Sequence, residues 1–514
     1  MGVLAVYDTV GIQNYIFASN KLSENVGGSK LVAEVFADVL SKAIESVTAQ
    51  KLPDWRDCGV LDPELIAEII YQGGGNAFVA YTDCDVFQAV TEEFLIETTQ
   101  KAPGIGIAVA AIETDFKDTY KSDFELLNKR IACTKGCFNI PVFAGNQTIT
   151  KQSGRTGLPV SHYREGEYLS DNQGMKRNRY AAYKKYERNS QIENFDDLAF
   201  DKGTDSSIAI IHADGNNMGK DIKSVMDRFT TYEEAVPEIR KLSAKIANCY
   251  KDALDRTIEA FSEVYEDYIA EHYSKSQAKQ IPEKKKEPPI LELINDGDDI
   301  TLVMGGRFAI DFAVRLLREI EKTSDKNRPF ENSKPTACAG VVLFNSHYPF
   351  SEAYKLAEEL CSSAKKTSRE YEGSYIDFHI HQSANVSSLK TLRDHQYKVD
   401  GKTILRRPWR VSAGLVNELP NFAWVEENIE AIKKMPRNKT KAIRNAIGAG
   451  DQAAQIAINQ IRDENLPEFP SMADDKIRAE NMSIFAHYFD ILEICDDYES
   501  LLNKEVRGSV EQKY

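Results

Sequence analysis

Residues 291–306 have the sequence LELINDGDDITLVMGG, in which two apolar runs flank a short polar segment. This pattern is typical of a β-hairpin whose turn carries Asp296, Gly297, Asp298 and Asp299. Two interpretations are open: an ordinary polar turn, since Asn, Asp and Gly favour turns, or carboxylates placed to bind metal. Like charges at one turn are destabilising unless a cation offsets them, which favours the metal.

The order of segments around this hairpin occurs twice. The strand SIAIIHAD ends at Asp214 and precedes a glycine turn, a helix over about 232–268, the hairpin, the strand TACAGVVLF and another helix. Near the N-terminus, the strand LAVYD ends at Asp8 and precedes a helix, the hairpin EIIYQGGGNAFVAYTD, the strand GIGIAVAAI and a helix. The repeated order of strand, helix, hairpin, strand and helix predicts a duplicated domain.

An acidic group distinguishes the second copy. If its first strand and its hairpin are neighbours in one sheet, Asp214, Asp298 and Asp299 converge. Mg²⁺ and Mn²⁺ prefer oxygen ligands, often one or two carboxylates completed by water and phosphate. Such ions activate an attacking hydroxyl and stabilise a pyrophosphate leaving group. This is the metal-binding layout of palm domains in polymerases and nucleotide cyclases. The predicted metal ligands are Asp214, Gly215, Asp298 and Asp299.

The first copy has glycines where the second has acids. Its hairpin tip is Gly73-Gly74-Gly75-Asn76, which offers no carboxylate for a metal pair. Glycines still let a substrate approach the backbone closely, so we predict that this copy seats a second nucleotide. A helical lysine, Lys365, is placed to contact a triphosphate, or is simply exposed. The predicted nucleotide-binding residues are Gly74, Gly75, Asn76, Gly215, Asn216, Asn217, Gly297 and Lys365.

Length and patterning predict an α+β protein of several domains, because 514 residues exceed what one core usually supports. We expect two ferredoxin-like palm domains and a C-terminal helical domain. The predicted ranges are 1–150 for a first, degenerate palm, 151–202 for a linker or insertion, 203–385 for the catalytic palm and 386–514 for a mainly helical domain.

The net charge of −15 argues against a broad nucleic-acid-coating surface. Two basic stretches, 176–188 and 433–444, are either solvated helix faces or local contacts for nucleic acid or a partner. Cys133 and Cys137 form the only close cysteine pair in the sequence, which favours a loop or core role over a zinc site. We expect a cytoplasmic protein, because the sequence has no apolar run of ~18–20 residues and no signal peptide pattern.

The ordered motifs resemble a known family. ADGNNMGK, the DGDD hairpin and AGVVLF…AEELCSSAKK resemble the catalytic palm of the large subunit of type III CRISPR–Cas effector complexes. DTVGIQNYIFASNKLSENVGGSKLV and YQGGGNAF resemble its first, degenerate palm, and RRPWR with MPRNKTKAIRNAI resembles its C-terminal region. The resemblance implies that the second palm polymerises ATP into cyclic oligoadenylate, with metal held by Asp214, Asp298 and Asp299.

The chain departs from this family at several points. Asp296 replaces the first hairpin glycine of the family, and Asn216 stands where many relatives carry another acid. There is no His-Asp dipeptide, so the HD nuclease domain of the family is missing from this sequence, and its zinc-binding insertion is not evident. The chain therefore resembles a compact relative with two palms and a helical domain.

The leading hypothesis is a nucleotidyltransferase that converts ATP, or another nucleoside triphosphate, into a cyclic nucleotide or oligonucleotide messenger in antiviral defence. It would need Mg²⁺ or Mn²⁺ and release pyrophosphate. The alternative is a non-catalytic palm-domain scaffold or sensor that binds nucleotide or RNA. A third possibility is an effector subunit that is active only with other CRISPR-type subunits on target RNA.

Overall fold

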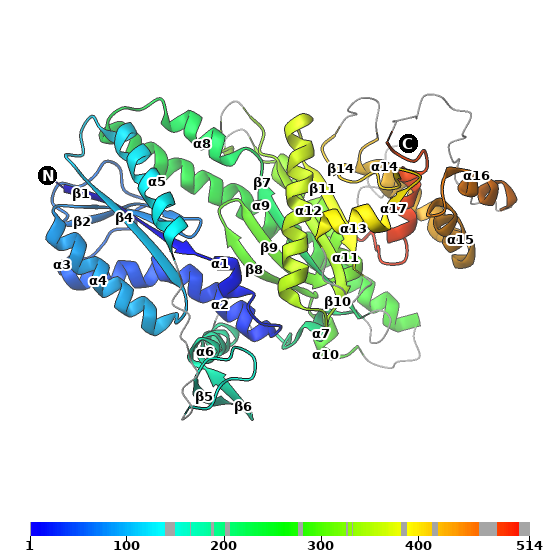
Figure 1. The fold of residues 1–514 in the computed structure, drawn as a ribbon, viewed down its shortest axis with the longest axis horizontal. Coiled ribbons are helices and arrows are strands. Elements are labelled where there is room, and N and C mark those ends of the chain that lie inside the picture. The colour runs from blue at the N-terminus through cyan, green and yellow to red at the C-terminus, as the bar shows by residue number, and fades with distance from the viewer. Residues whose placement is uncertain are drawn as a thin grey trace.

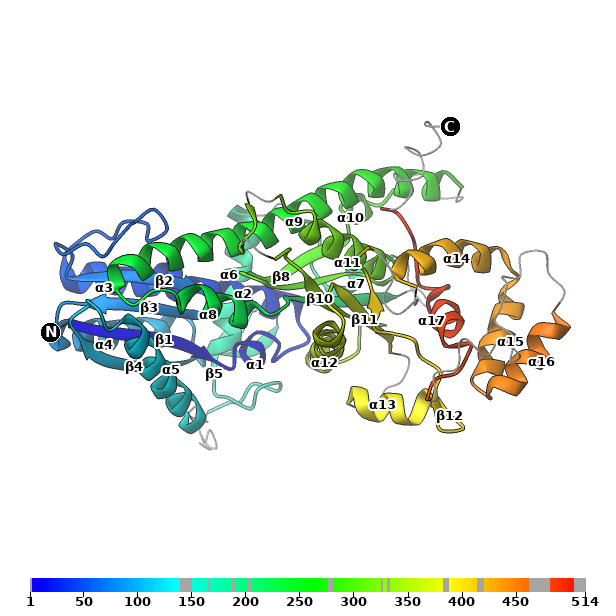
Figure 2. The same ribbon diagram turned by 90° about the horizontal axis from the view of Figure 1, so that it is seen from above.

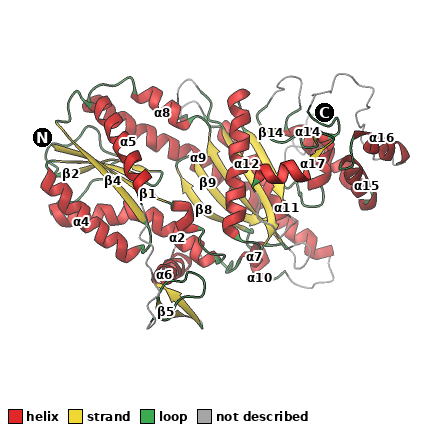
Figure 3. Ribbon diagram, in the orientation of Figure 1, coloured by secondary structure: helices red, strands yellow, loops and turns green. Residues whose placement is uncertain are grey.

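Two mixed helix-and-sheet units and a C-terminal group of helices follow one another along an elongated molecule (Figures 1 and 3). The structure is a computed structural model. It describes residues 2–138, 150–164, 166–186, 190–200, 206–275, 281–324, 327–330, 333–381, 388–413, 420–461 and 481–502. None of the helices in these ranges combines the length and apolar character needed to cross a membrane.

The first sheet has the strand order β2-β3-β1-β4, and each neighbouring pair is antiparallel. Its strands are β1 (Gly2–Val10), β2 (Ala67–Gly73), β3 (Asn76–Tyr81) and β4 (Gly106–Thr114). The helical segments are α1 (Ile12–Ile16), α2 (Leu22–Glu34), a π-helix (Val35–Leu40), α3 (Ser41–Thr48), α4 (Cys84–Lys101) and α5 (Tyr120–Cys137). This is the ferredoxin-like arrangement predicted for the first copy.

The second sheet repeats that order as β8-β9-β7-β10 and adds two strands beyond β10, first β11 and then β14 at the edge. Its strands are β7 (Ser207–Gly215), β8 (Ile290–Asp296), β9 (Asp299–Gly305), β10 (Ala337–Asn345), β11 (Tyr375–Ile380) and β14 (Trp409–Arg410). Its helices are α8 (Met218–Met226), α9 (Tyr232–Lys275), α10 (Glu283–Lys286), α11 (Gly306–Glu321) and α12 (Phe350–Glu370). The predicted duplication and the α+β class are confirmed.

The segment order expected from the sequence was incomplete in one respect. Each unit has a further helix between its hairpin and its fourth strand, α4 in the first and α11 in the second. α11 directly follows β9, and most of its residues are buried. No polar turn separates this strand from this helix, so the boundary between them has only a weak signal in the sequence.

Helix α9 joins the two units, because it packs on β2 of the first and on α11 of the second (Figure 2). Arg240, in its third turn, is 1% exposed and makes a 2.6 Å ion pair with Glu68 of β2. The same guanidinium donates to the carbonyl oxygens of Gly59, Ile69 and Ile70. A buried arginine with its donors satisfied fixes the orientation of α9 against the first sheet.

Residues between the two units form a hairpin and a helix. The elements are β5 (Val160–Arg164), β6 (Glu167–Ser170), α6 (Asp171–Tyr186) and α7 (Phe195–Leu198). The first basic stretch lies on α6, but its first two residues are buried rather than solvated. Lys176 donates to the Tyr15 carbonyl, and Arg177 pairs with Glu24 at 2.8 Å. These two cations therefore hold α6 against α1 and α2, which corrects both sequence interpretations for them.

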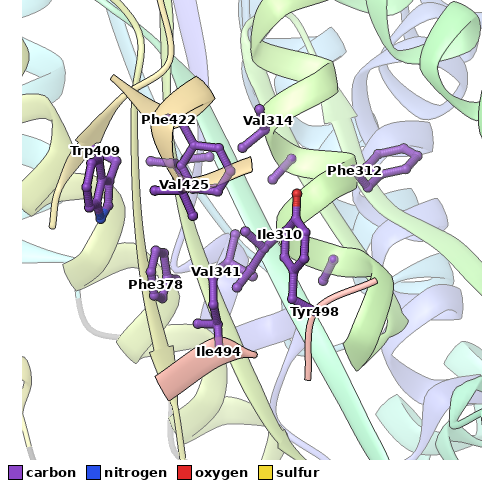
Figure 4. Close-up of a cluster of buried hydrophobic side chains, with 14 of the residues drawn as sticks. Ile310, Phe312, Val314, Val341, Phe378, Trp409, Phe422, Val425, Ile494 and Tyr498 are labelled. Carbon is purple, nitrogen blue, oxygen red and sulfur yellow. The ribbon is translucent and has the colours of Figure 1, made fainter. Parts of the chain in front are cut away.

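The C-terminal helices pack on the second sheet through a shared core. They are α13 (Leu389–Gln396), α14 (Phe422–Lys434), α15 (Arg437–Ile447), α16 (Asp451–Gln460) and α17 (Ala486–Ile494), with a small ribbon of β12 (Lys398–Val399) and β13 (Lys402–Thr403). Figure 4 shows Phe422 and Val425 meeting Ile310 and Val341 of the palm. β14 also lies in the palm sheet, so the C-terminal range contributes an edge strand.

Candidate active site between two hairpins

The second palm brings its three predicted catalytic acids to one edge of the sheet. β8 and β9 are joined by a two-residue turn, Gly297–Asp298, and Gly297 has a φ of 62°, which glycine adopts without strain. The pairing of β7 with β9 places Asp214 opposite Asp299. Strand register and turn chemistry therefore produce the cluster that the sequence predicts.

The first palm has the same backbone with different side chains. Asp8 of β1 lies opposite Asn76 of β3, as Asp214 lies opposite Asp299. Its turn, Gly74–Gly75, has φ values of 62° and 74°. The positions equivalent to the two hairpin acids are thus glycine and asparagine. The carboxylate cluster belongs to the second palm alone within this pair of hairpins.

Burial and mutual repulsion make the hairpin acids weak acids. Burial, followed by the charge of Asp214, raises the pKa of Asp298 to about 6. The pKa of Asp299 is raised further, by burial first and by the neighbouring carboxylates second. Asp214 is offset by a cation, because Lys365 Nζ lies 2.5 Å from its Oδ2. Lys365 therefore points into the acidic cluster and is not a freely solvated helical lysine.

A buried, neutral histidine lies beside Asp299. Burial lowers the pKa of His212 to about 4. Its Nδ1 lies 3.1 Å from Thr301 Oγ1 and 3.4 Å from Asp299 Oδ1. That carboxylate oxygen is buried without a hydrogen-bond partner among the described residues, although Asp299 exposes 38% of its side chain. An unsatisfied buried carboxylate oxygen is costly, and a bound cation would satisfy it.

The donor set fits a hard divalent cation, although the residues do not form a complete cage. Within the described ranges, no group of three or more His, Cys, Asp or Glu side chains is placed to hold a metal ion together. Mg²⁺ commonly takes one or two carboxylates and completes its shell with water and substrate phosphate. The unsatisfied Asp299 oxygen and the repelling carboxylates of Asp214 and Asp298 fit that mode of binding.

The residues after Asp214 have separate positions. Gly215 ends β7 beneath Asp298, where an added Cβ would lie 2.8 Å from Asp298 Oδ2. Asn216 donates its side-chain amide to Thr336 Oγ1 and to the Gly373 carbonyl, so it anchors a loop. Asn217 has a φ of 58° and begins α8. Asn216 thus makes structural contacts at the position where the resemblance implies an acid.

A cavity of about 950 Å³ lies between the two hairpins. Gly73, Gly74 and Asn76 line it from the first palm, and Asp296, Gly297 and Asp298 line it from the second. Asp214, Asp299 and Lys365 are not among its lining residues. The remaining walls come mainly from β2, β3, α5, α8 and α9. They include the apolar or aromatic residues Tyr71, Phe78, Tyr120, Phe124, Met218 and Ile222, and the lysines Lys121, Lys129 and Lys223.

Sequence reasoning missed these helical walls. Phe124 and Met218 are ordinary apolar residues of amphipathic helices, and helical periodicity does not distinguish a cavity wall from a core position. A second omission is the contact of Asp296, whose Oδ2 accepts a hydrogen bond from Gly75 N at 3.2 Å. The signal that could have indicated this contact was the additional acid at position 296, which the hairpin turn alone does not require.

One domain of the chain matches a known family. Residues 207–372 match the family model described as Cas10/Cmr2, second palm domain. The chain contains a Cas10-like palm. The match covers the strand of Asp214, the hairpin of Asp298 and Asp299, and helix α12 with Lys365. The resemblance stated from the sequence motifs is therefore confirmed. The comparison with curated proteins found no match.

Solved structures share the fold of most of the chain. The chain is similar to a chain of the Csm1–Csm4 cassette in complex with AMPPNP, with a TM-score of 0.54 and 14% identity. Cassettes in complex with cA4 and with one ATP give TM-scores of 0.53 each, at 14% and 13% identity. Each match covers 96% of this chain and 69% of the other. At this identity, the likeness establishes the shared fold.

Proposed function

We propose that the chain is a metal-dependent nucleotidyltransferase that converts ATP into a cyclic oligonucleotide or cyclic nucleotide. The observation that carries the proposal is the pairing of two similar hairpins, of which one bears the acids Asp298 and Asp299 opposite Asp214. The two palms share one fold but differ in their side chains. This difference suits a reaction between two nucleotides with different roles, one supplying the attacking hydroxyl and the other the phosphate that is attacked.

The acids of the second palm would hold the cation. Asp214, Asp298 and Asp299 are the candidate ligands, with Mg²⁺ or Mn²⁺ as the ion. When bound, the ion would neutralise charge on the reacting phosphate and activate the attacking hydroxyl. Lys365 already offsets Asp214 at 2.5 Å, and on release from this carboxylate its ammonium group would reach the triphosphate.

The cavity would hold the nucleotides. Its aromatic and aliphatic walls suit a base, and its glycine-containing hairpin turns allow the backbone to approach a sugar or phosphate. The 3′-hydroxyl of the nucleotide on the first palm would attack the α-phosphate of the nucleotide on the second. A new O–P bond forms, the α–β phosphoanhydride bond breaks, and pyrophosphate leaves.

One observation favours the alternative of a non-catalytic scaffold or sensor. Lys365 neutralises Asp214, and the described acids do not assemble a cage of three or more ligands. A palm pair fixed in this state would bind nucleotide or RNA without turnover.

The Csm1–Csm4 cassettes also contain a second kind of subunit. By analogy, a partner subunit on target RNA would displace Lys365 and activate the site.

Pyrophosphate release tests the proposal. The purified chain is incubated with ATP and Mg²⁺ or Mn²⁺, and pyrophosphate is measured over time. We expect release by the wild type and a loss of about 10- to 100-fold in Asp298→Asn, because the amide keeps an oxygen but lacks the negative charge that would hold the cation. Asp252→Asn, at an exposed position of α9, is the matched control and should keep full activity. Equal release by wild type and Asp298→Asn would overturn the proposal.

A further inference from the structure

The two palms can be aligned position by position from their strand pairing alone. In the first palm Asp8 pairs with Asn76 of β3 and with Ala108 of β4. In the second, Asp214 pairs with Asp299 of β9 and with Cys338 of β10. Each aspartate thus occupies the same place in its sheet, and Ala108 is equivalent to Cys338. This alignment uses hydrogen-bond register and needs no sequence similarity.

The same alignment gives Lys365 a counterpart in the first palm. Lys135 follows Ala108 by as many residues as Lys365 follows Cys338, and both lie on the helix after the fourth strand. Each lysine contacts the aspartate of its own palm: Lys135 Nζ lies 2.9 Å from Asp8 Oδ2, and Lys365 Nζ lies 2.5 Å from Asp214 Oδ2. The palm that lacks the hairpin acids therefore contains the same ion pair as the palm that has them.

The charge around Lys135 differs from that around Lys365. Gly75 and Asn76 replace the two hairpin acids, so Asp8 is the carboxylate that the first palm itself supplies at this strand end. The second palm adds one carboxylate at the glycine turn, because Asp296 accepts a hydrogen bond from Gly75 N at 3.2 Å. Asp8 exposes 18% of its side chain and Lys135 exposes 41%. Without hairpin carboxylates to hold a cation, positive charge for a phosphate at this tip must come from side chains. Lys135 is the side chain in contact with the strand aspartate.

Lys135 also continues the helix face that borders the cavity. Lys129 and Ala132 of α5 line the cavity between the hairpins. Lys135 follows Ala132 at helical spacing, one turn closer to the helix end, and so lies on the same face. Its contact with Asp8 places its ammonium group beside β1, whose Thr9 amide donates to the Gly75 carbonyl of the glycine turn at 2.9 Å.

We propose that Lys135 is the phosphate-binding lysine of the first palm. Its ligand class is the polyphosphate of a nucleoside triphosphate, and Asp8 holds the ammonium group in position when no phosphate is bound. The inference deepens the proposed function, because it assigns the triphosphate of the attacking nucleotide to a residue of the non-catalytic palm. A phosphate group competes with Asp8 for the same ammonium group, so the Asp8 carboxylate weakens phosphate binding.

Two variants with opposite expected effects test this assignment. The probe is inorganic tripolyphosphate, titrated calorimetrically into the full chain in the presence of EDTA, so that neither metal nor turnover contributes. Lys135→Gln should weaken binding about tenfold, since a charge-assisted contact is lost. Asp8→Asn should tighten binding, since the competing carboxylate is removed. Lys101→Gln is the matched control, because Lys101 is 38% exposed on α4 and pairs with Glu97 at 3.4 Å.

Each outcome decides between named alternatives. Any of three results would overturn the assignment. They are a Kd of Lys135→Gln for tripolyphosphate within about twofold of that of the control, a higher Kd for Asp8→Asn than for the wild type, or no binding by the wild type. These results leave pyrophosphate release by the wild type unaffected, so the proposed function can survive the loss of this inference. Conversely, the expected binding changes in a chain that never releases pyrophosphate would leave Lys135 assigned and overturn the proposed function. Equal melting temperatures of the variants confirm that all are folded.

Discussion

The carboxylate of Asp296 accepts a hydrogen bond from the backbone amide of Gly75, with 3.2 Å between Oδ2 and N. This bond joins the turns of the two palm hairpins at the edge of the cavity that both turns line. Asp296 is also the residue at which the chain departs from the glycine of the family it resembles. The bond sets the separation of the hairpins, which is where two nucleotides would have to meet.

Asp296→Gly should therefore affect nucleotide binding more than folding. The bond is partly buried and links one buried donor to an exposed side chain, so its loss should change the free energy of unfolding by about 1 kcal/mol. Without it, the two turns can separate, and we expect the KM for ATP to rise several-fold. Asp296→Asn keeps an acceptor oxygen and removes the charge, so its KM should stay close to that of the wild type. Steady-state kinetics of the three proteins checks this, and equal KM values for wild type and Asp296→Gly would contradict it.

Gly215→Ala should inactivate the site with a modest loss of stability. The added Cβ would lie 2.5 Å from Tyr250 Oη and 2.8 Å from Asp298 Oδ2, so one of these side chains must move. Displacing a catalytic group by about 1 Å costs on the order of 100-fold in rate. Gly59→Ala, where an added Cβ meets nothing within 4 Å, is the control. Pyrophosphate release measures the effect, and a Gly215→Ala variant with normal activity would contradict this geometry.

Gly27→Ala should separate α6 from α2. A Cβ at Gly27 would lie 1.8 Å from the Lys176 carbonyl oxygen, which is backbone and cannot rotate away. Overpacking of this kind costs about 1–3 kcal/mol and exceeds the gain in helix propensity from alanine. Gly136→Ala on α5 has open space around its Cβ and should be neutral or stabilising. Thermal unfolding together with hydrogen exchange of α6 distinguishes the two, and equal protection of α6 would count against the prediction.

The buried Asp311 should make stability depend on pH. It accepts hydrogen bonds from the Leu501 and Leu502 amides and the Tyr498 hydroxyl, yet burial raises its pKa from 3.8 to about 6. Between these values the folded protein binds more protons than the unfolded chain, so the free energy of unfolding falls as pH rises. The contribution of this group should fall by up to about 3 kcal/mol from pH 4 to pH 7.

Asp311→Asn removes this titration. The stability of the wild type relative to the variant should therefore decrease from pH 4 to pH 7, while groups common to both proteins cancel. Denaturant unfolding at several pH values, followed by the fluorescence of the buried Trp409, measures the difference. A difference that is constant with pH would show that folding does not raise the pKa of Asp311 and would contradict the prediction.

The duplicated fold and the meeting of Asp214 with Asp299 were predictable because they follow from local rules. Strand alternation, turn residues and the order of segments are all written within short stretches, and they specify the ferredoxin-like arrangement. Comparison of the two copies then indicated the role of Asp298 and Asp299, because the equivalent hairpin of the first copy lacks these acids.

The features that escaped prediction depend on remote partners. Lys176 and Arg177 belong to a basic stretch that resembles a solvated face, and only the contacts with Tyr15 and Glu24 bury them. The contact of Asp296 with Gly75 likewise joins residues from different units. Lys135 has no motif of its own, and its place beside Asp8 emerges only when the two sheets are aligned by register.

Mass spectrometry of the nucleotide product tests the central claim most directly. The purified chain is incubated with each nucleoside triphosphate and Mg²⁺ or Mn²⁺, alongside the double variant Asp298→Ala/Asp299→Ala. We predict a cyclic product from ATP in the wild-type reaction and none in that of the variant. Unchanged ATP with both cations, together with retained ATP or RNA binding, would contradict catalysis and leave a palm-domain scaffold as the function.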